Sequence, residues 1–267
     1  MIVLKYEIRF ILFHVQKKLE DLINTIYEQY IIYMNPVAFS IGCFNVRWYG
    51  LAYLATFIIS MKLVKNTIKF QKPIAFKSSD IDSCLNYVIA GVILGGRIGE
   101  FVFYKHKLFT MEIFYITKGG MSFHGGVCGV IIASLIFAKL HKKNLLQLGD
   151  LITMCVPIGS FLGRIGNYIN QEILGKSTTI FEPYLSEHPV VFYEAFLEGI
   201  VLFLILFRRK KLAITGRITS EFFIFYGLFR FCTEFVRVSD GSLGILSIAQ
   251  WLSIGMIIFG SILRYKH

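Results

Sequence analysis

Several side chains that could bind an anion lie close together between residues 163 and 176, directly after an apolar run. If this segment is helical, Arg164, Asn167 and Gln171 share one face, because their spacing follows the helical repeat. A guanidinium and neighbouring carboxamides suit a phosphate and its ester oxygens. The alternative is a helix that serves only for packing, with Arg164 reaching toward the membrane surface.

Other ionisable and polar residues recur inside apolar segments, where a charge costs roughly 2.5–3.5 kcal/mol on insertion scales and usually lines a cavity or a substrate path. They include Tyr49, Arg97, His124, Arg230, Glu234 and Arg237. His124 stands beside two glycines at the start of an apolar segment, a position compatible with a general base or a hydrogen-bonded structural histidine. Arg230 and Glu234 are spaced for an ion pair that could simply join helices.

The composition is that of a membrane protein. Hydrophobic residues make up 55% of the 267 residues, and the mean hydropathy of +0.62 is too high for a soluble domain with one core. The net charge of +11 comes from cations that cluster between apolar segments, which indicates membrane topology rather than nucleic-acid binding. The five cysteines are scattered without a C-x-x-C pair, so no disulfide framework or zinc site is predicted.

We predict an all-α, polytopic membrane protein with about seven transmembrane helices. Each apolar segment is close to the roughly 20 residues that cross the hydrocarbon as a helix. The segments are residues 48–64, 87–104, 121–140, 150–168, 190–207, 219–236 and 245–263.

Cations alternate between the connections. The richest connections are residues 62–77, 139–143 and 208–217, and the positive-inside rule places them in the cytoplasm. The first span then starts outside and the carboxyl terminus lies inside. Because most of the polar residues fall near the outer half of the spans, we predict one polar cavity that opens outward or sideways to the outer leaflet.

The chain divides into an amino-terminal extension, residues 1–33, and a membrane-embedded region, residues 34–267. The extension mixes charged and apolar residues and lacks the short apolar core of a signal peptide. It is either an amphipathic surface helix or sequence that precedes a true start at Met34.

Motifs spread along the chain share an order and spacing with one enzyme family. They are Arg47-Trp48-Tyr49-Gly50, Gly95-Gly96-Arg97-Ile98-Gly99, Ser122-Phe123-His124-Gly125-Gly126, Gly163-Arg164-Ile165-Gly166-Asn167, His188-Pro189 with Tyr193-Glu194, Tyr226-Gly227 with Arg230-Phe231 and Glu234-Phe235, and Gln250 with Leu252-Ser253. In these motifs the chain resembles bacterial prolipoprotein diacylglyceryl transferases over about residues 34–260.

The resemblance implies a seven-span enzyme of the bacterial inner membrane that moves the diacylglyceryl group of phosphatidylglycerol onto the lipobox cysteine of a prolipoprotein. The products would be a thioether and glycerol phosphate, in the first step of lipoprotein maturation, without a metal or cofactor. The catalytic candidates are His124, Arg164, Arg230 and Tyr49. The substrate-binding candidates are Arg164, Asn167, Asn170, Glu172, Gly175, Glu234, Arg97 and Arg237.

The residue types fit that chemistry. A thiol, with a reference pKa near 8.5, attacks only as the thiolate, and His124 could accept its proton directly or through water. Arg164 and Arg230 could hold the negative charge of the leaving phosphate. Glu172 and Glu234 suit positioning of the arginines better than proton transfer.

The chain departs from the family pattern at the predicted outer rim, with Glu187, Val190, Val191, Ser239 and Ala249. Two other classes of protein remain open on the residues alone. A small membrane transporter or channel for an anion or lipid would also use buried arginines, although no repeated halves are visible. A structural membrane scaffold would use the same residues only as ion pairs.

Overall fold

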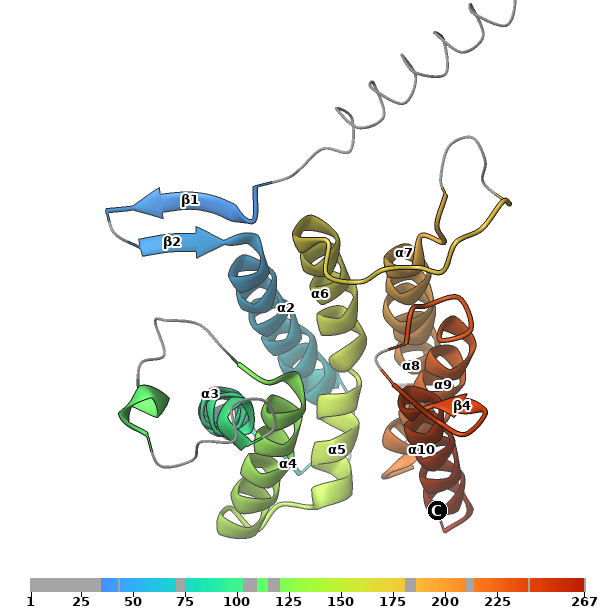
Figure 1. The fold of residues 1–267 in the computed structure, drawn as a ribbon. Coiled ribbons are helices and arrows are strands. Elements are labelled where there is room, and N and C mark those ends of the chain that lie inside the picture. The colour runs from blue at the N-terminus through green and yellow to red at the C-terminus, as the bar shows by residue number, and fades with distance from the viewer. Residues whose placement is uncertain are drawn as a thin grey trace, which may run out of the picture.

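The computed structural model describes residues 35–42, 44–70, 75–102, 110–114, 121–180, 186–209, 214–239 and 241–266. Within them the chain is mostly helical, and most of the long helices run side by side, whereas the helix Ser78–Glu100 lies across them and is seen end-on (Figure 1). The proposed extension, residues 1–33, and Met34 lie outside the described residues.

The elements follow in chain order. They are β1 (Val37–Ile41), β2 (Phe44–Arg47), α2 (Trp48–Phe70), α3 (Ser78–Glu100), η2 (Met111–Phe114), α4 (Phe123–Leu140), α5 (Leu145–Thr153), α6 (Val156–Asn170), α7 (Val190–Glu194), η4 (Ala195–Val201), α8 (Leu202–Arg209), α9 (Arg217–Thr233), β3 (Ser242–Leu243), β4 (Leu246–Ser247) and α10 (Ile248–Tyr265). The two short antiparallel hairpins, β1–β2 and β3–β4, are additions to the predicted all-α architecture.

Helices occupy the positions of the predicted spans. Five helical stretches in the described part of the chain are long and apolar enough to cross a membrane: Trp48–Lys69, Ser78–Glu100, Leu145–Asn170, Val190–Arg208 and Ile248–Tyr265. The apolar helix His124–Leu140 is shorter, and α9 has 17 residues. The structure therefore describes a multi-pass membrane protein.

The second span begins earlier than the hydropathy pattern predicts, at Ser78 rather than near residue 87. Its first turn is polar and is held by a capping contact, in which the Lys77 N–H donates to Asp80 Oδ2 over 2.7 Å. Asp80 also pairs with Lys143 Nζ at 2.5 Å, which joins the start of α3 to the connection after α4. An apolar window misses such a turn because its stability comes from capping and charge.

One predicted span consists of two helices. Between α5 and α6 the chain turns at Met154 and Cys155, and Pro157 lies in the first turn of α6. Proline has no N–H to donate and fits the first turn of a helix. Asp150 on α5 then anchors the start of α9, accepting N–H groups from Gly216 at 2.7 Å and Thr219 at 2.8 Å.

A seam of glycines joins α3 to α4. A Cβ atom added at Gly129 would lie 2.0 Å from the Gly91 carbonyl oxygen, and one at Gly95 would lie 2.3 Å from the Gly125 carbonyl oxygen. The two backbones are in contact, an arrangement typical of helices packed inside a membrane. The start of α4, where His124 lies, is therefore set by the glycines of α3.

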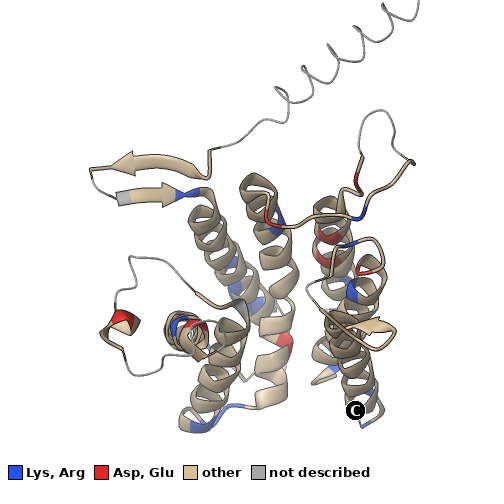
Figure 2. Cartoon of the chain, in the orientation of Figure 1, with Lys and Arg blue, Asp and Glu red and all other residues tan. Residues whose placement is uncertain are grey.

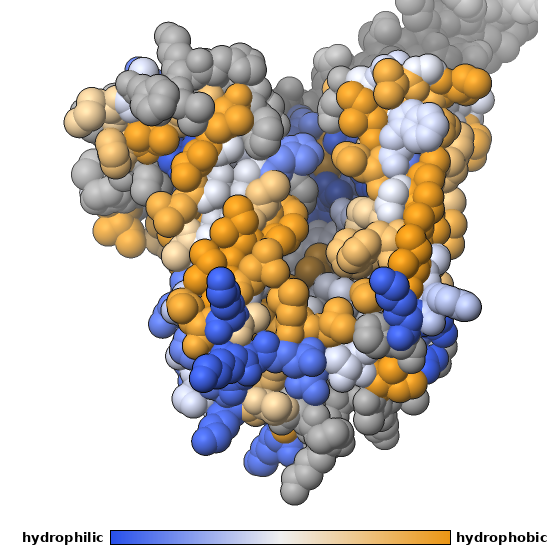
Figure 3. Space-filling model, turned by 90° about the horizontal axis from the view of Figure 1, so that it is seen from below, coloured by the Kyte–Doolittle hydropathy of each residue, from blue (hydrophilic) through white to orange (hydrophobic). Residues whose placement is uncertain are grey.

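Among the residues that the structure describes, buried hydrophobic side chains form two clusters, one around Phe137, Leu148 and Leu151 and one around Met154 and Leu202. Many large hydrophobic residues instead face outward, and orange areas cover much of the face in Figure 3, which is hollowed toward its middle. Such an apolar exterior suits hydrocarbon, because lipid replaces the protein partners that a soluble fold would need.

A buried arginine–glutamate cluster

Two fully buried glutamates lie one turn apart at the junction of α7 and η4. Glu194 ends α7 and Glu198 lies within η4, and both side chains are 0% exposed. The η4 segment is a π-helix, a rare wider turn that often occurs at functional sites. Because an unpaired buried carboxylate is strongly unfavourable, the surroundings must supply cations.

Arg164 on α6 contacts both glutamates. Its Nε lies 3.0 Å from Glu194 Oε2 and its Nη2 lies 3.2 Å from Glu198 Oε2. Its Nη1 donates to Asn167 Oδ1, one turn further along α6, over 3.3 Å. The predicted shared face is therefore confirmed for Arg164 and Asn167, but the prediction is wrong for Gln171, which follows the last residue of α6 in a left-handed conformation.

Two more arginines reach the same carboxylates from α9 and the turn after it. Arg230 Nη1 contacts Glu194 Oε1, and Arg230 Nη2 lies 2.9 Å from Glu234 Oε2. Arg237 Nη1 lies 3.2 Å from Glu194 Oε1. The predicted Arg230–Glu234 pair is confirmed, and it is part of a larger network. Figure 2 shows basic and acidic residues along α6, α7 and α9.

We call this set of three arginines and three glutamates the Arg–Glu cluster: Arg164, Arg230, Arg237, Glu194, Glu198 and Glu234. Its formal charges balance. The arginine side chains Arg164 and Arg230 are 18% and 15% exposed, whereas Glu194 and Glu198 are 0% exposed. The carboxylates are therefore shielded, and only the arginine side chains of these pairs are partly exposed. A guanidinium has five N–H donors, so these arginines can contact a further anion.

Glu172 lies beside the cluster, where α6 ends. Its carboxylate accepts from Asn167 Nδ2 at 2.7 Å and from Asn170 Nδ2 at 2.9 Å. The intervening Gln171 adopts a left-handed conformation that ends the helix and turns the chain back. Asn167 thus links Arg164 to Glu172. Together with Asn170 they form one hydrogen-bonded set of four predicted residues.

Tyr49 is positioned by α6. A Cβ atom at Gly166 would lie 2.4 Å from Tyr49 Cδ2, so only glycine allows the ring to pack there. The Tyr49 hydroxyl is 3.4 Å from that of Tyr53, which donates to it. Tyr49 is therefore adjacent to the α6 segment that carries Arg164 and Asn167.

Gly175 lies where three segments cross above the cluster. It pairs with Arg237 as an antiparallel bridge, and a Cβ atom there would be 2.0 Å from the His188 carbonyl oxygen. The Lys176 N–H donates to Val236 over 2.8 Å, and the His188 N–H donates to Lys176 over 3.0 Å. Gly175 thus ties the end of α6, the start of α7 and the end of α9 together.

The structure puts the other two predicted residues on the α3–α4 pair. His124 is exposed in the first turn of α4, which Ser122 caps by accepting from the Gly125 N–H over 3.2 Å. Arg97 is buried on α3 and donates to the carbonyl oxygens of Ile113 at 2.9 Å and Glu112 at 2.5 Å. Arg97 therefore holds η2 in place.

Glu194 and Glu198 are the residues that our sequence analysis did not select, although they touch both candidate arginines. The sequence does hold a signal for them, because the two glutamates lie four residues apart inside an apolar span. Charged side chains in such a span face a partner and not lipid. The departures Val190 and Val191 are buried at the start of α7, so they contribute packing.

A multi-pass helical membrane protein with partly exposed arginines held by buried carboxylates is suited to bind an anionic group at the membrane. The sequence model of the family described as prolipoprotein diacylglyceryl transferase matches residues 36–265. The chain belongs to this family, as the motif resemblance predicted.

Relatives with curated names agree with the family match. A phosphatidylglycerol–prolipoprotein diacylglyceryl transferase of Pseudoalteromonas translucida is 42% identical over 245 residues, covering 85% of this chain and 90% of the relative. The protein of the same name from Mannheimia succiniciproducens is also 42% identical, with 85% and 91% coverage. That of Buchnera aphidicola is 38% identical over 270 residues, with 87% and 96% coverage.

Proposed function

We propose that this protein transfers the diacylglyceryl group of phosphatidylglycerol to the lipobox cysteine of a prolipoprotein. The names of its relatives support the two substrates and the transfer. The observation that carries the proposal is the Arg–Glu cluster, in which Arg164 and Arg230 are partly exposed while their carboxylates are buried.

In the proposed reaction the cysteine sulfur attacks the glyceryl carbon that bears the phosphate. A carbon–sulfur bond forms, the carbon–oxygen bond to phosphate breaks, and glycerol phosphate leaves with the bonding electrons. Negative charge grows on the leaving oxygen, and Arg164 and Arg230 would hold it by charge-assisted hydrogen bonds. Glu194 and Glu198 fix both guanidinium groups in advance, so little reorganisation is needed.

The remaining candidates surround this centre. Tyr49 and Asn167 would orient the headgroup or an acyl ester, because Asn167 bonds to Arg164 and Tyr49 packs against Gly166 of the same helix. Asn170 and Glu172 would keep Asn167 in position.

The outer residues would shape the entrance. Gly175 and Arg237 lie in the crossing above the cluster, and Glu234 orients Arg230. Arg97 would keep η2 at the rim through its two carbonyl contacts. We propose that the entrance is a polar cavity open to the outer leaflet among seven spans.

His124 would accept the thiol proton. It comes from α4, whereas the Arg–Glu cluster comes from α6, α7, η4 and α9, so substrate would have to lie between the two groups. A base on one side and a phosphate clamp on the other would place the attacked carbon in line between sulfur and leaving oxygen. We place the enzyme in the bacterial inner membrane.

Reconstitution tests this function. The purified chain in vesicles with labelled phosphatidylglycerol should convert a lipobox peptide to a diacylglyceryl thioether and release an equal amount of glycerol phosphate. A peptide with serine in place of the cysteine should not react. Anion or lipid movement across sealed vesicles without peptide modification would instead support the transporter class.

A further inference from the structure

An arginine-lined pocket lies at the opposite end of α9 from Arg230. It has a volume of about 200 Å³ and is lined by Ile214, Arg217, Ser220 and Arg264. Arg217 opens α9 and Arg264 lies in the last turn of α10. Since a helix rises about 1.5 Å per residue, this pocket is roughly 20 Å from Arg230 along α9.

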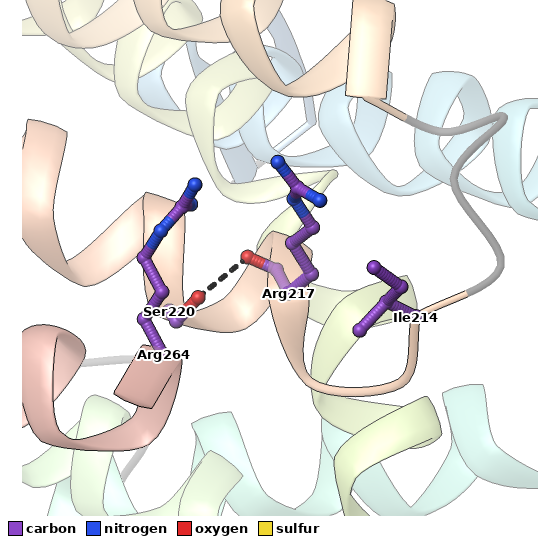
Figure 4. Close-up of a pocket in the computed structure, with 4 residues that line it drawn as sticks. All are labelled: Ile214, Arg217, Ser220 and Arg264. Carbon is purple, nitrogen blue, oxygen red and sulfur yellow. Dashed lines mark hydrogen bonds between the residues drawn. The ribbon is translucent and has the colours of Figure 1, made fainter. Parts of the chain in front are cut away.

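The two arginines converge on one carboxylate oxygen. Arg217 Nε lies 3.2 Å and Arg264 Nη1 lies 2.6 Å from Oε1 of the buried Glu221. Figure 4 shows both arginine side chains running in the same direction on either side of Ser220, whose hydroxyl donates to the Arg217 carbonyl over 2.8 Å. Two cations therefore share one anion and leave a formal charge of +1 at the pocket.

In the described contacts, the neighbouring carboxylate of Asp150 is not paired with either arginine. The nearby Asp150 is occupied by the N–H groups of Gly216 and Thr219 and by the Thr219 hydroxyl. In the contacts that the structure describes around the pocket, Arg217 uses only Nε and Arg264 only Nη1, of five N–H donors each. The remaining donors can bind a phosphate, whose oxygens match the fork of a guanidinium.

One wall of the pocket is apolar. Ile214, which lines the pocket beside the arginines, has an exposed apolar side chain. A ligand with a phosphate and acyl chains would contact both the arginines and the apolar side of the pocket, whereas a free phosphate would contact only the arginines. The connection 208–217 also belongs to the side that the sequence predicts to be cytoplasmic, where anionic lipids attract basic residues.

We propose that this pocket binds the phosphate of an acidic phospholipid in the cytoplasmic leaflet. The lipid would bridge α9 and α10 from outside and steady the helix that carries Arg230 at its other end. The site differs from the Arg–Glu cluster in residues and in membrane depth, and it does not depend on the transfer reaction.

The test is to count acidic lipids retained by the full-length protein in native mass spectrometry after transfer from discs of phosphatidylglycerol or phosphatidylcholine. Arg217→Gln and Arg264→Gln should each weaken retention of one phosphatidylglycerol by roughly tenfold or more, as expected for losing a charge-assisted hydrogen bond. The control Lys142→Gln removes one exposed cation from another connection and should retain the wild-type number. Arg230→Lys should also keep this lipid.

Two further measurements make the outcome decisive. Glu221→Gln removes the competing carboxylate and should tighten retention, and glycerol phosphate without acyl chains should compete poorly. Unchanged lipid numbers in both glutamine variants would overturn the proposal, and so would equal binding of glycerol phosphate. If these variants instead lower the melting temperature equally in both lipids, with no lipid-specific loss, the three residues are only a clamp between α9 and α10.

Discussion

In the proposed reaction His124 transfers the proton and the arginines stabilise the negative charge. The two roles predict different dependences of the transfer rate on pH. A general base matters most when the thiol is protonated, whereas an anion clamp matters at every pH. His124 lies on α4 and Arg164 on α6, so the two side chains can be substituted separately.

We predict that His124→Gln lowers transfer by roughly 10²–10⁴-fold, the usual range for general acid–base catalysis. The deficit should shrink as pH rises from about 6.5 to 9, because the thiol loses its proton unaided near its reference pKa. Turnover per folded molecule over that range checks this.

The matched control is His141→Gln, at the other end of the same helix, where the ring stacks on Phe137 with centroids 4.4 Å apart. It should leave turnover unchanged. Full activity of a folded His124→Gln protein at all pH values would leave the base to water, Tyr49 or a carboxylate.

At this scale the sequence predicted most of the cluster but not its centre. Arg164, Arg230 and Arg237 are conspicuous because a buried cation needs a reason. The two central glutamates were visible as residues in a span, but periodicity cannot show which helix faces them. That pairing between α6 and α7 depends on tertiary packing, which makes Glu194 the common partner of three arginines.

At the scale of elements, the α3–α4 seam sets the position of His124. We predict that Gly129→Ala lowers stability by about 1–3 kcal/mol, the usual cost of overpacking, because its Cβ would meet the Gly91 carbonyl at 2.0 Å. Gly126→Ala is the control in the same helix, since its Cβ would find only the Val92 carbonyl at 3.9 Å. Thermal unfolding in detergent measures both, and equal melting temperatures would argue against the close seam.

A comparison of the predicted and observed helices shows which features hydropathy can predict. Apolar windows located every long helix, because burial in lipid and helix length follow from side-chain type. They missed the early start of α3 and the division between α5 and α6, which arise from capping and from Pro157. They also gave no sign of the crossing at Gly175, which joins three chain segments by backbone hydrogen bonds.

At the scale of the whole molecule, topology is the first test. The cation-rich connections predict that residues 170–188 face outside and residues 208–217 face inside. A cysteine introduced at Thr179 should react with an impermeant reagent applied from the periplasmic side, and one at Arg208 should react only after permeabilisation. The reverse pattern would invert the orientation and move the Arg–Glu cluster to the inner half.

The amino terminus gives a second whole-molecule prediction. The family match starts at residue 36, after the proposed extension. A chain that begins at Met34 should insert and transfer at the full-length rate, as measured with the lipobox peptide. A truncated protein that inserts but no longer transfers would make residues 1–33 part of the enzyme.

The central claim is that the Arg–Glu cluster holds the phosphate of phosphatidylglycerol during transfer. Lysine keeps the charge but cannot span Glu194, Glu198 and Asn167 as Arg164 does. The control Arg208→Lys makes the same change at an exposed position at the end of α8.

The most direct measurement is transfer per folded molecule for Arg164→Lys and Arg230→Lys beside that control. We predict a loss of roughly 10²–10³-fold in both cluster variants, as for removal of one donor to a developing oxyanion, and an unchanged rate in the control. Near-normal transfer by both folded cluster variants would contradict the account and leave the arginines as a link between helices.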